Sequence, residues 1–175
     1  LKTPSDIIGV FKIPNSDFDK KDINQSLSIL LDDVQDPGNL GSILRTAEAA
    51  GIKSVFLSKS SAELWSPKTL RGSQGAQLNL RCYEDQDLLR LFDQVSLPIY
   101  SLSVCGDSLY GDDIPKDLIL ILGSEGGGIN AEIISKSTKS ISIPMHGSIE
   151  SLNVGAAAGI FIYEYFRRHR LNVGD

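Results

Sequence analysis

The sequence predicts an α/β fold, with a mostly parallel sheet that carries helices on both faces. Three observations support this class. Short apolar segments typical of strands alternate with segments typical of helices along most of the chain. Several of the strand segments are almost continuously apolar, as expected of strands buried on both faces of a parallel sheet. The length of 175 residues and the hydrophobic share of 41% suit one domain with a substantial core.

The predicted elements follow one another in a regular order. The first strand is SILLDD at 28–33, and the turn DPGN leads into a helix over 40–50 that ends at Gly51. Further strands are expected at 53–58, 78–82, 99–104, 118–122 and 141–143, the last of which is stopped by Pro144. Helices are expected after the Ser66-Pro67 cap, over 85–95, over 130–137, and from Ser151 or Asn153 to Arg168.

Residues 1–26 are polar and irregular apart from an apolar cluster at 7–11. We expect a linker or docking arm here, followed by a single domain over 27–175. The first residue is Leu rather than Met, which indicates a piece of a longer protein. No apolar run approaches the roughly 20 residues that cross a bilayer, and no signal peptide is visible. Because Cys82 and Cys105 lack metal-ligand spacing, we interpret them as reduced thiols of a cytoplasmic protein without a metal or membrane partner.

Three segments of unusual composition follow predicted strands, where ligands bind in parallel sheets. NLGSILR at 39–45 places Arg45 about one turn into a helix, and GSEGGG at 123–128 allows main-chain groups to contact a ligand closely. The run GAAAG at 155–159 indicates a helix packed against another backbone or a flat ligand. A solvated Arg45 and an ordinary loop at 123–128 are the alternative interpretations. Neither GxGxxG nor a P-loop is present, which disfavours a dinucleotide-binding enzyme.

Taken together, these segments resemble the motifs of the SpoU/TrmH RNA ribose 2′-O-methyltransferases, a branch of the SPOUT superfamily. DPGNLGSILRTAEAAG resembles motif 1, LILILGSEGGGI resembles motif 2, and ISIPMHGSIESLNVGAAAGI resembles motif 3. The resemblance runs from about Ser28 to Arg168. It implies that 27–175 is a catalytic domain that transfers a methyl group from S-adenosylmethionine to a ribose 2′-hydroxyl of RNA. It also implies a deep C-terminal trefoil knot and a homodimer with both active sites near the subunit interface.

The resemblance also assigns roles to individual residues. The catalytic set that it implies is Arg45 and Asn39 from motif 1, Glu125 from motif 2, and Ser151 and Asn153 from motif 3. The cofactor-binding set is Gly123, Ile143 and Leu152, with Leu102 and Met145 as neighbours. One departure is that Gly155 stands where the family usually has Ser, which puts a secondary polar contact in doubt.

The implied partner is RNA, with ribosomal RNA as the first expectation and transfer RNA as the second. The net charge of −5 disfavours a broad nucleic-acid surface, so we expect local contacts or help from another region. Guanidinium keeps its proton at neutral pH, so we favour Arg45 as a charge that stabilises an oxyanion, with proton removal by Arg45 left open. Two other classes remain as alternatives: a non-catalytic RNA-binding relative, and a nucleotide-binding enzyme such as a dehydrogenase.

Overall fold

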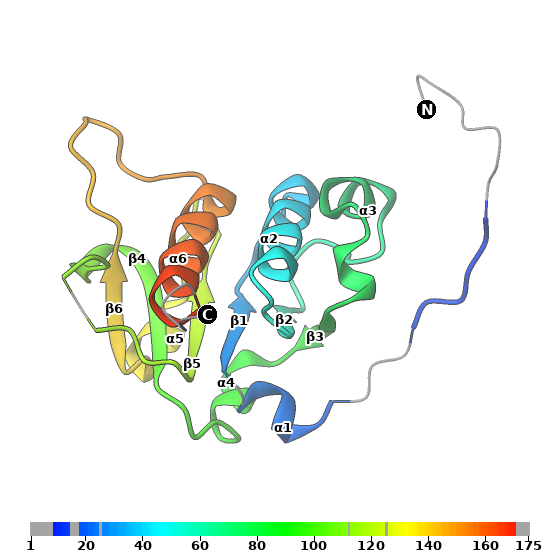
Figure 1. The fold of residues 1–175 in the computed structure, drawn as a ribbon, viewed down its shortest axis with the longest axis horizontal. Coiled ribbons are helices and arrows are strands. Elements are labelled where there is room, and N and C mark those ends of the chain that lie inside the picture. Colours follow the sequence, from blue (N-terminus) through cyan, green and yellow to red (C-terminus); the bar gives the residue numbers. More distant parts are fainter. Residues whose placement is uncertain (1–8, 15–17, 25, 112, 125, 171–175) are drawn as a thin grey trace.

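The computed structural model describes residues 9–14, 18–24, 26–111, 113–124 and 126–170. Its centre is a six-stranded sheet in which every neighbouring pair of strands runs parallel (Figure 1). The strand order is β3-β2-β1-β5-β4-β6, which confirms the predicted parallel α/β class. The strands are β1 (Leu27–Leu31), β2 (Ser54–Ser58), β3 (Arg81–Gln86), β4 (Ile99–Ser108), β5 (Leu118–Leu122) and β6 (Lys139–Ser142).

Helices cover both faces of the sheet, as the sequence predicts. Because successive strand residues point to opposite faces, Ile29 and Leu31 of β1 belong to one core and Leu30 to the other. On the first face lie α2 (Pro37–Ala49) and α6 (Val154–His169), with α3 (Pro67–Ser73) packed against α2. On the second face lie α1 (Lys20–Ile23), α4 (Leu88–Phe92) and α5 (Ala131–Lys136).

The segment before β1 is packed on the sheet. The ring of Phe18 meets Phe56 and Tyr83 edge to face, with centroids 5.8 and 5.7 Å away. The Asp22 carboxylate is buried, accepts a hydrogen bond from the Tyr83 hydroxyl at 2.5 Å, and forms an ion pair with Arg81. A buried carboxylate is tolerated when it is paired and hydrogen-bonded in this way. Residues 18–24 therefore contribute to the core of the second face.

Two side-chain caps and a short 3-10 helix move element boundaries from their predicted places. Helix α2 begins at Pro37 instead of residue 40, because the Asp36 carboxylate accepts hydrogen bonds from the main-chain N–H groups of Gly38 and Asn39 at 2.6 and 3.0 Å. Helix α4 begins only at Leu88, because Asp87 caps it. The third strand starts at 81 instead of 78, since Ala76–Leu78 form a short 3-10 helix, η1.

Strand β4 extends well beyond its predicted end at residue 104. Ile141 of β6 is paired with both Leu102 and Asp107 of β4, so the residues between these two leave the ladder and then return to it. At the crossing, a Cβ on Gly106 would lie 2.5 Å from the Ser140 carbonyl oxygen. Such a close approach of two backbones requires glycine at this position.

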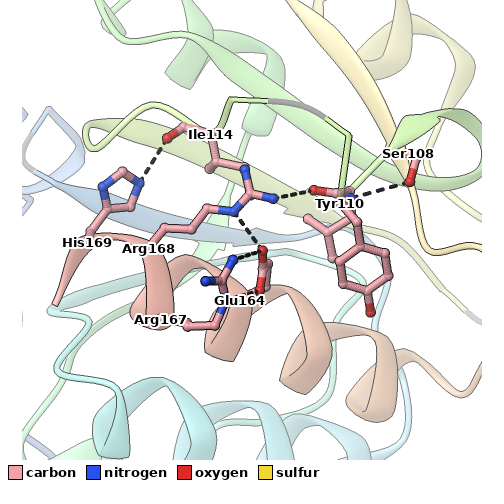
Figure 2. Close-up of polar contacts among 8 residues, drawn as sticks. Ser108, Tyr110, Ile114, Glu164, Arg167, Arg168 and His169 are labelled. Carbon is pink, nitrogen blue, oxygen red and sulfur yellow. Dashed lines mark hydrogen bonds and ion pairs between the residues drawn. The ribbon is translucent and has the colours of Figure 1, made fainter. Parts of the chain in front are cut away.

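The end of α6 is tied to the connection between β4 and β5. Arg168 donates one hydrogen bond to Glu164 at 2.7 Å and another to the Leu109 carbonyl at 2.9 Å (Figure 2). The ring of the next residue, His169, lies 2.8 Å from the Ile114 carbonyl, and one turn earlier the Tyr165 hydroxyl donates to the Lys116 carbonyl at 2.6 Å. We call the group of Glu164, Arg168 and the Leu109 carbonyl the C-terminal clasp.

Candidate functional site

A cavity of about 540 Å³ opens at the carboxyl ends of β4, β5 and β6. This volume lies within the range of roughly 300–1,000 Å³ that is typical of small-molecule sites. Every residue of the predicted cofactor-binding set lines it, together with one member of the predicted catalytic set: Leu102, Gly123, Ile143, Met145, Leu152 and Ser151. These residues come from three separate segments, so the fold gathers them as the sequence motifs predict.

The sequence reasoning missed part of the cavity wall. Ser103, Val104 and Cys105 line it where β4 leaves its ladder with β6. Ile129 and Ile134 come from the segment that leads into and through α5. The rule that ligands bind at carboxyl ends of strands would have pointed here, because residues 103 and 104 end the predicted strand and residue 105 follows it.

The glycine-rich loop after β5 forms one wall and closes on itself. Ser124 and Gly128 exchange two main-chain hydrogen bonds of 3.0 and 2.9 Å. A Cβ on Gly123 would lie 2.2 Å from the Gly128 carbonyl oxygen, so any larger residue would push the loop open. The glycine requirement at 123 is therefore explained by the chain's own packing, in addition to any ligand.

The start of α6 is fixed to the start of α2 by two asparagines. The Asn153 side-chain oxygen caps α6 by accepting from the N–H groups of Gly155 and Ala156 at 3.0 and 3.2 Å, which decides between the two predicted caps. Its amide nitrogen donates to the Asn39 side-chain oxygen at 3.0 Å. The bond joins residues from motifs 1 and 3 that are 114 positions apart. The pair thereby sets how α6, which forms part of the cavity wall, lies against α2.

Gly155 sits where these two helices meet. A Cβ at this position would lie 3.2 Å from the Asn153 side-chain oxygen and 3.6 Å from both the Asn39 side-chain oxygen and the Ser42 Cβ. All three atoms belong to side chains, so the helices meet closely here, but the predicted approach of another backbone is not seen at Gly155. In contrast, a Cβ on Gly159, one turn later, would have no described atom within 4 Å.

Arg45 does not lie at the cavity. Its side chain is exposed on α2, and Arg45 is absent from the residues that line the cavity. Because α2 begins at Pro37, Arg45 is more than two turns into the helix, so the prediction of about one turn was wrong. Glu125 lies outside the described residues. Among the predicted catalytic residues, the structure thus joins Asn39 to Asn153, places Ser151 at the cavity and leaves Arg45 apart within one chain.

The two cysteines have contrasting environments. Burial raises the pKa of the Cys82 thiol to about 12, and the nearby Glu84 carboxylate adds to the shift. Cys105 is exposed at the cavity. In the described part of the chain, no three His, Cys, Asp or Glu side chains are grouped so as to hold a metal ion. No described helix combines the length and apolarity that crossing a membrane requires.

The fold and the gathered motifs define a class, and comparison with known proteins gives it a name. The family model of the SpoU rRNA Methylase family matches residues 26–163. The chain is 34% identical over 167 residues to the 23S rRNA (guanosine(2553)-2′-O)-methyltransferase RlmP of Bacillus subtilis, covering 93% of this chain and 65% of that protein. The chain therefore belongs to the SpoU rRNA Methylase family.

A second relative and a solved structure support the same family. The chain is 35% identical over 154 residues to the 23S rRNA (guanosine-2′-O-)-methyltransferase RlmB of Nitrosomonas europaea, covering 86% of this chain and 59% of that protein. The crystal structure of the SpoU methyltransferase AviRb from Streptomyces viridochromogenes with AdoMet matches with a TM-score of 0.83 and 27% identity, covering 92% of this chain and 64% of that one. The chain thus spans less than two thirds of the length of these relatives.

Proposed function

We propose that this chain carries the catalytic unit of an RNA ribose 2′-O-methyltransferase that uses S-adenosylmethionine. The observation that carries the proposal is the cavity, because it unites the predicted cofactor positions from three distant segments, among them Leu102, Gly123 and Ile143. The names of the relatives support the reaction, and the AviRb structure contains the same cofactor. The proposed catalytic unit is residues 27–175, on whose core residues 18–24 of the proposed N-terminal arm are packed.

The cavity has the chemistry that this cofactor needs. Ile143, Leu152 and Leu102 offer apolar surface for the flat adenine ring, and the glycine loop after β5 offers main-chain groups for its polar atoms. The cofactor supplies an electrophilic methyl group on a sulfonium. The protein's share of the work is to hold that methyl in line with the ribose hydroxyl, and such alignment can supply on the order of 7–11 kcal/mol.

Polar residues of the three motifs are proposed to stabilise the transition state and to position the reactants. Arg45 is proposed to stabilise the oxyanion that develops on the ribose, because a fixed guanidinium charge favours the deprotonated hydroxyl. Asn39 and Asn153 are proposed to act through position, since their mutual bond holds α2 against α6. Ser151, at the cavity, and Glu125 are proposed to orient the reactants.

A homodimer would bring Arg45 to a cofactor. Within one chain Arg45 is exposed and does not line the cavity, so the site lacks its cationic residue. Inside a helix, glycine is about 1 kcal/mol less favourable than alanine. At Gly159 no contact within the described chain explains the glycine, because no described atom lies within 4 Å of the place that a Cβ would take. Tyr163, one turn further along α6, is 51% exposed. We therefore propose that a second copy packs on α6 and α2 and that Arg45 completes the partner's site.

The proposed fold also includes a deep trefoil knot. Two observations support it: residues 103–106 cross β6, and α6 is held against the β4–β5 connection through the C-terminal clasp. The segment between β6 and α6 joins the edge of the sheet to its centre (Figure 1). We propose that this segment passes through the loop formed by the β4–β5 connection, so that the cavity is built on the knot.

Ribosomal RNA is the proposed substrate, because the family model and the RlmP and RlmB relatives are named for it. Transfer RNA is the second candidate, since a similar structure with a TM-score of 0.73 and 26% identity is described as an A. aeolicus TrmH/SpoU tRNA modifying enzyme. The net charge of −5 indicates that the RNA is held by local contacts.

Calorimetry with S-adenosylmethionine, followed by a radiolabelled methyl-transfer assay on ribosomal and transfer RNA, tests the proposal. Saturable cofactor binding and label at ribose 2′-oxygens of ribosomal RNA are the expected results. Cofactor binding without transfer to either RNA would favour the non-catalytic relative. Thermal stabilisation by NAD in place of S-adenosylmethionine would favour the dehydrogenase class and overturn the proposal.

A further inference from the structure

Three helices lie side by side on the face of the sheet that carries α6. Helix α2 is in the middle, with α6 on one side and α3 on the other (Figure 1). Between α2 and α3 the contact is close, since a Cβ on Gly41 would lie 2.8 Å from the Cα of Gly72. The surface that α2 exposes therefore continues directly onto α3.

Contacts along this pair fix the relative position of their side chains. Lys68 pairs with Asp36 at 3.1 Å, Gly72 touches Gly41, and Asn79 bonds Glu48 at 3.3 Å. The chain therefore runs through α3 and η1 in the same direction as through α2. Arg71, next to Gly72, lies at the level of Gly41. The Cα of Arg45 is one turn further along α2, a rise of about 6 Å.

The arginines of this surface differ from four of the other five described arginines of the chain. Arg81, Arg90, Arg167 and Arg168 each form an ion pair with a carboxylate. Arg45 and Arg71 are exposed, and neither has a carboxylate within 4.0 Å among the described residues. Two uncompensated guanidinium groups on adjoining helices form a local positive site on a chain of net charge −5.

We infer that Arg71 binds a backbone phosphate of the substrate RNA close to the nucleotide that meets Arg45. The inference rests on the proposed function and extends it from the reacting ribose to the strand beside it. Guanidinium suits the task, because its planar fork can donate two parallel hydrogen bonds to one phosphate. Lys68 contributes less, since Asp36 already compensates its charge. Arg71 is thus an RNA-binding residue outside the cofactor cavity.

This role predicts a separation of kinetic effects. Arg71→Ala should raise KM for RNA roughly three- to tenfold at low salt and leave kcat nearly unchanged, because a phosphate that takes no part in the reaction is held equally in the ground and transition states. Arg71→Lys should restore part of the affinity, because Lys also binds phosphate as a point charge. Affinity for S-adenosylmethionine and the melting temperature should not change.

The decisive measurement is the affinity of a fluorescein-labelled single-stranded oligouridylate for the 175-residue chain over a series of salt concentrations. Arg71→Ala should reduce the slope of log affinity against log salt by about 0.7, the value for one phosphate on a single strand. Arg90→Ala is the matched control. Arg90 lies on α4 on the opposite face, has an 85% exposed side chain, and pairs with Asp87.

Each outcome is informative. An unchanged slope for Arg71→Ala, an equal loss for Arg90→Ala, or no binding by the unmodified chain at low salt would overturn the inference. Because oligouridylate binding is read without turnover, a chain that binds through Arg71 yet transfers no methyl group would contradict only the proposed function. A lower melting temperature of Arg71→Ala would assign the residue a structural role, which Arg71→Glu would test independently, since it should weaken binding further without disturbing a packed contact.

Discussion

At the scale of single residues, Arg45 carries the most specific prediction. Arg45→Ala should reduce methyl transfer by about 10²–10³ and leave affinity for S-adenosylmethionine nearly unchanged, because a charge that acts mainly on the transition state affects turnover and not ground-state binding. Arg45→Lys should restore little, since a point charge does not reproduce the planar fork. Calorimetry and single-turnover methylation on one RNA measure the two effects separately.

The control for this variant is Ser42→Ala, which changes an exposed residue one turn earlier on α2. It should leave both measurements unchanged. Near-normal turnover of Arg45→Ala would remove the residue from the mechanism. Loss of cofactor binding in a variant that folds normally would place Arg45 in a different site.

Cys105 provides a probe of the cavity that requires no RNA. It is exposed at the cavity wall, so N-ethylmaleimide should alkylate it, and saturating S-adenosylmethionine should slow the reaction. Cys82 is the internal control, because it is buried and its thiol pKa is raised to about 12. It should react only after denaturation. Mass spectrometry of the labelled chain gives both rates, and an unchanged rate at Cys105 would exclude the cavity as the cofactor site.

Ionisation of the Glu164 carboxyl contributes to the free energy of unfolding. Its side chain is 11% exposed, and the hydrogen bond from Arg167, followed by that from Arg168, holds the pKa of its carboxyl at about 2 instead of the ordinary 4.5. A lowered pKa in the folded state means that the contribution to stability is complete above about pH 4.5 and is lost as the pH falls toward about 2. Urea unfolding of wild type and Glu164→Gln should therefore differ most near neutral pH and converge in acid. A difference that stays constant down to about pH 3 would contradict this linkage.

At the scale of secondary-structure elements, the contact between α2 and α3 depends on glycine. Gly41→Ala would place a Cβ 2.8 Å from the backbone of Gly72, and overpacking of this kind costs roughly 1–3 kcal/mol. The gain of about 1 kcal/mol in helix propensity offsets only part of that cost. We expect a lower free energy of unfolding in urea. Ser42→Ala, on the exposed side of the same helix, should be neutral, and a stabilised Gly41→Ala would show that the two helices can separate freely.

At the scale of the whole molecule, the proposed homodimer can be tested at Gly159. Within the chain, Gly159→Ala meets no described atom within 4 Å and improves helix propensity by about 1 kcal/mol. If a second copy packs there, the same change should weaken association roughly tenfold, about 1.4 kcal/mol. Sedimentation at micromolar concentration should show a wild-type mass of about twice 19.0 kDa and a larger monomer fraction for the variant.

Glu132→Ala on α5, on the opposite face, is the control for association. A monomeric wild-type chain that still binds S-adenosylmethionine would refute the dimer. A dimer that Gly159→Ala leaves intact would place the interface away from this part of α6.

Local signals in the sequence were sufficient to predict the sheet and the helices that cover it. The buried strands β1 and β5 could be predicted because each is an almost unbroken apolar run, which a parallel sheet covered on both faces requires. The caps at Ser66 and Asn153 could be predicted because capping depends on a few neighbouring residues. The cofactor positions came from the resemblance of motifs 2 and 3, with Leu102 as a neighbour, and the cavity unites the five of them.

Contacts between distant residues were decided only by the tertiary structure. The bond from Asn153 to Asn39, the crossing of β6 by residues near Gly106, and the close packing of α3 on α2 join segments with no local signal for each other. The separation of Arg45 from the cavity likewise follows from how α2 is placed on the sheet. Periodicity and capping report on a few neighbouring residues, whereas these contacts depend on how all the elements pack together at once.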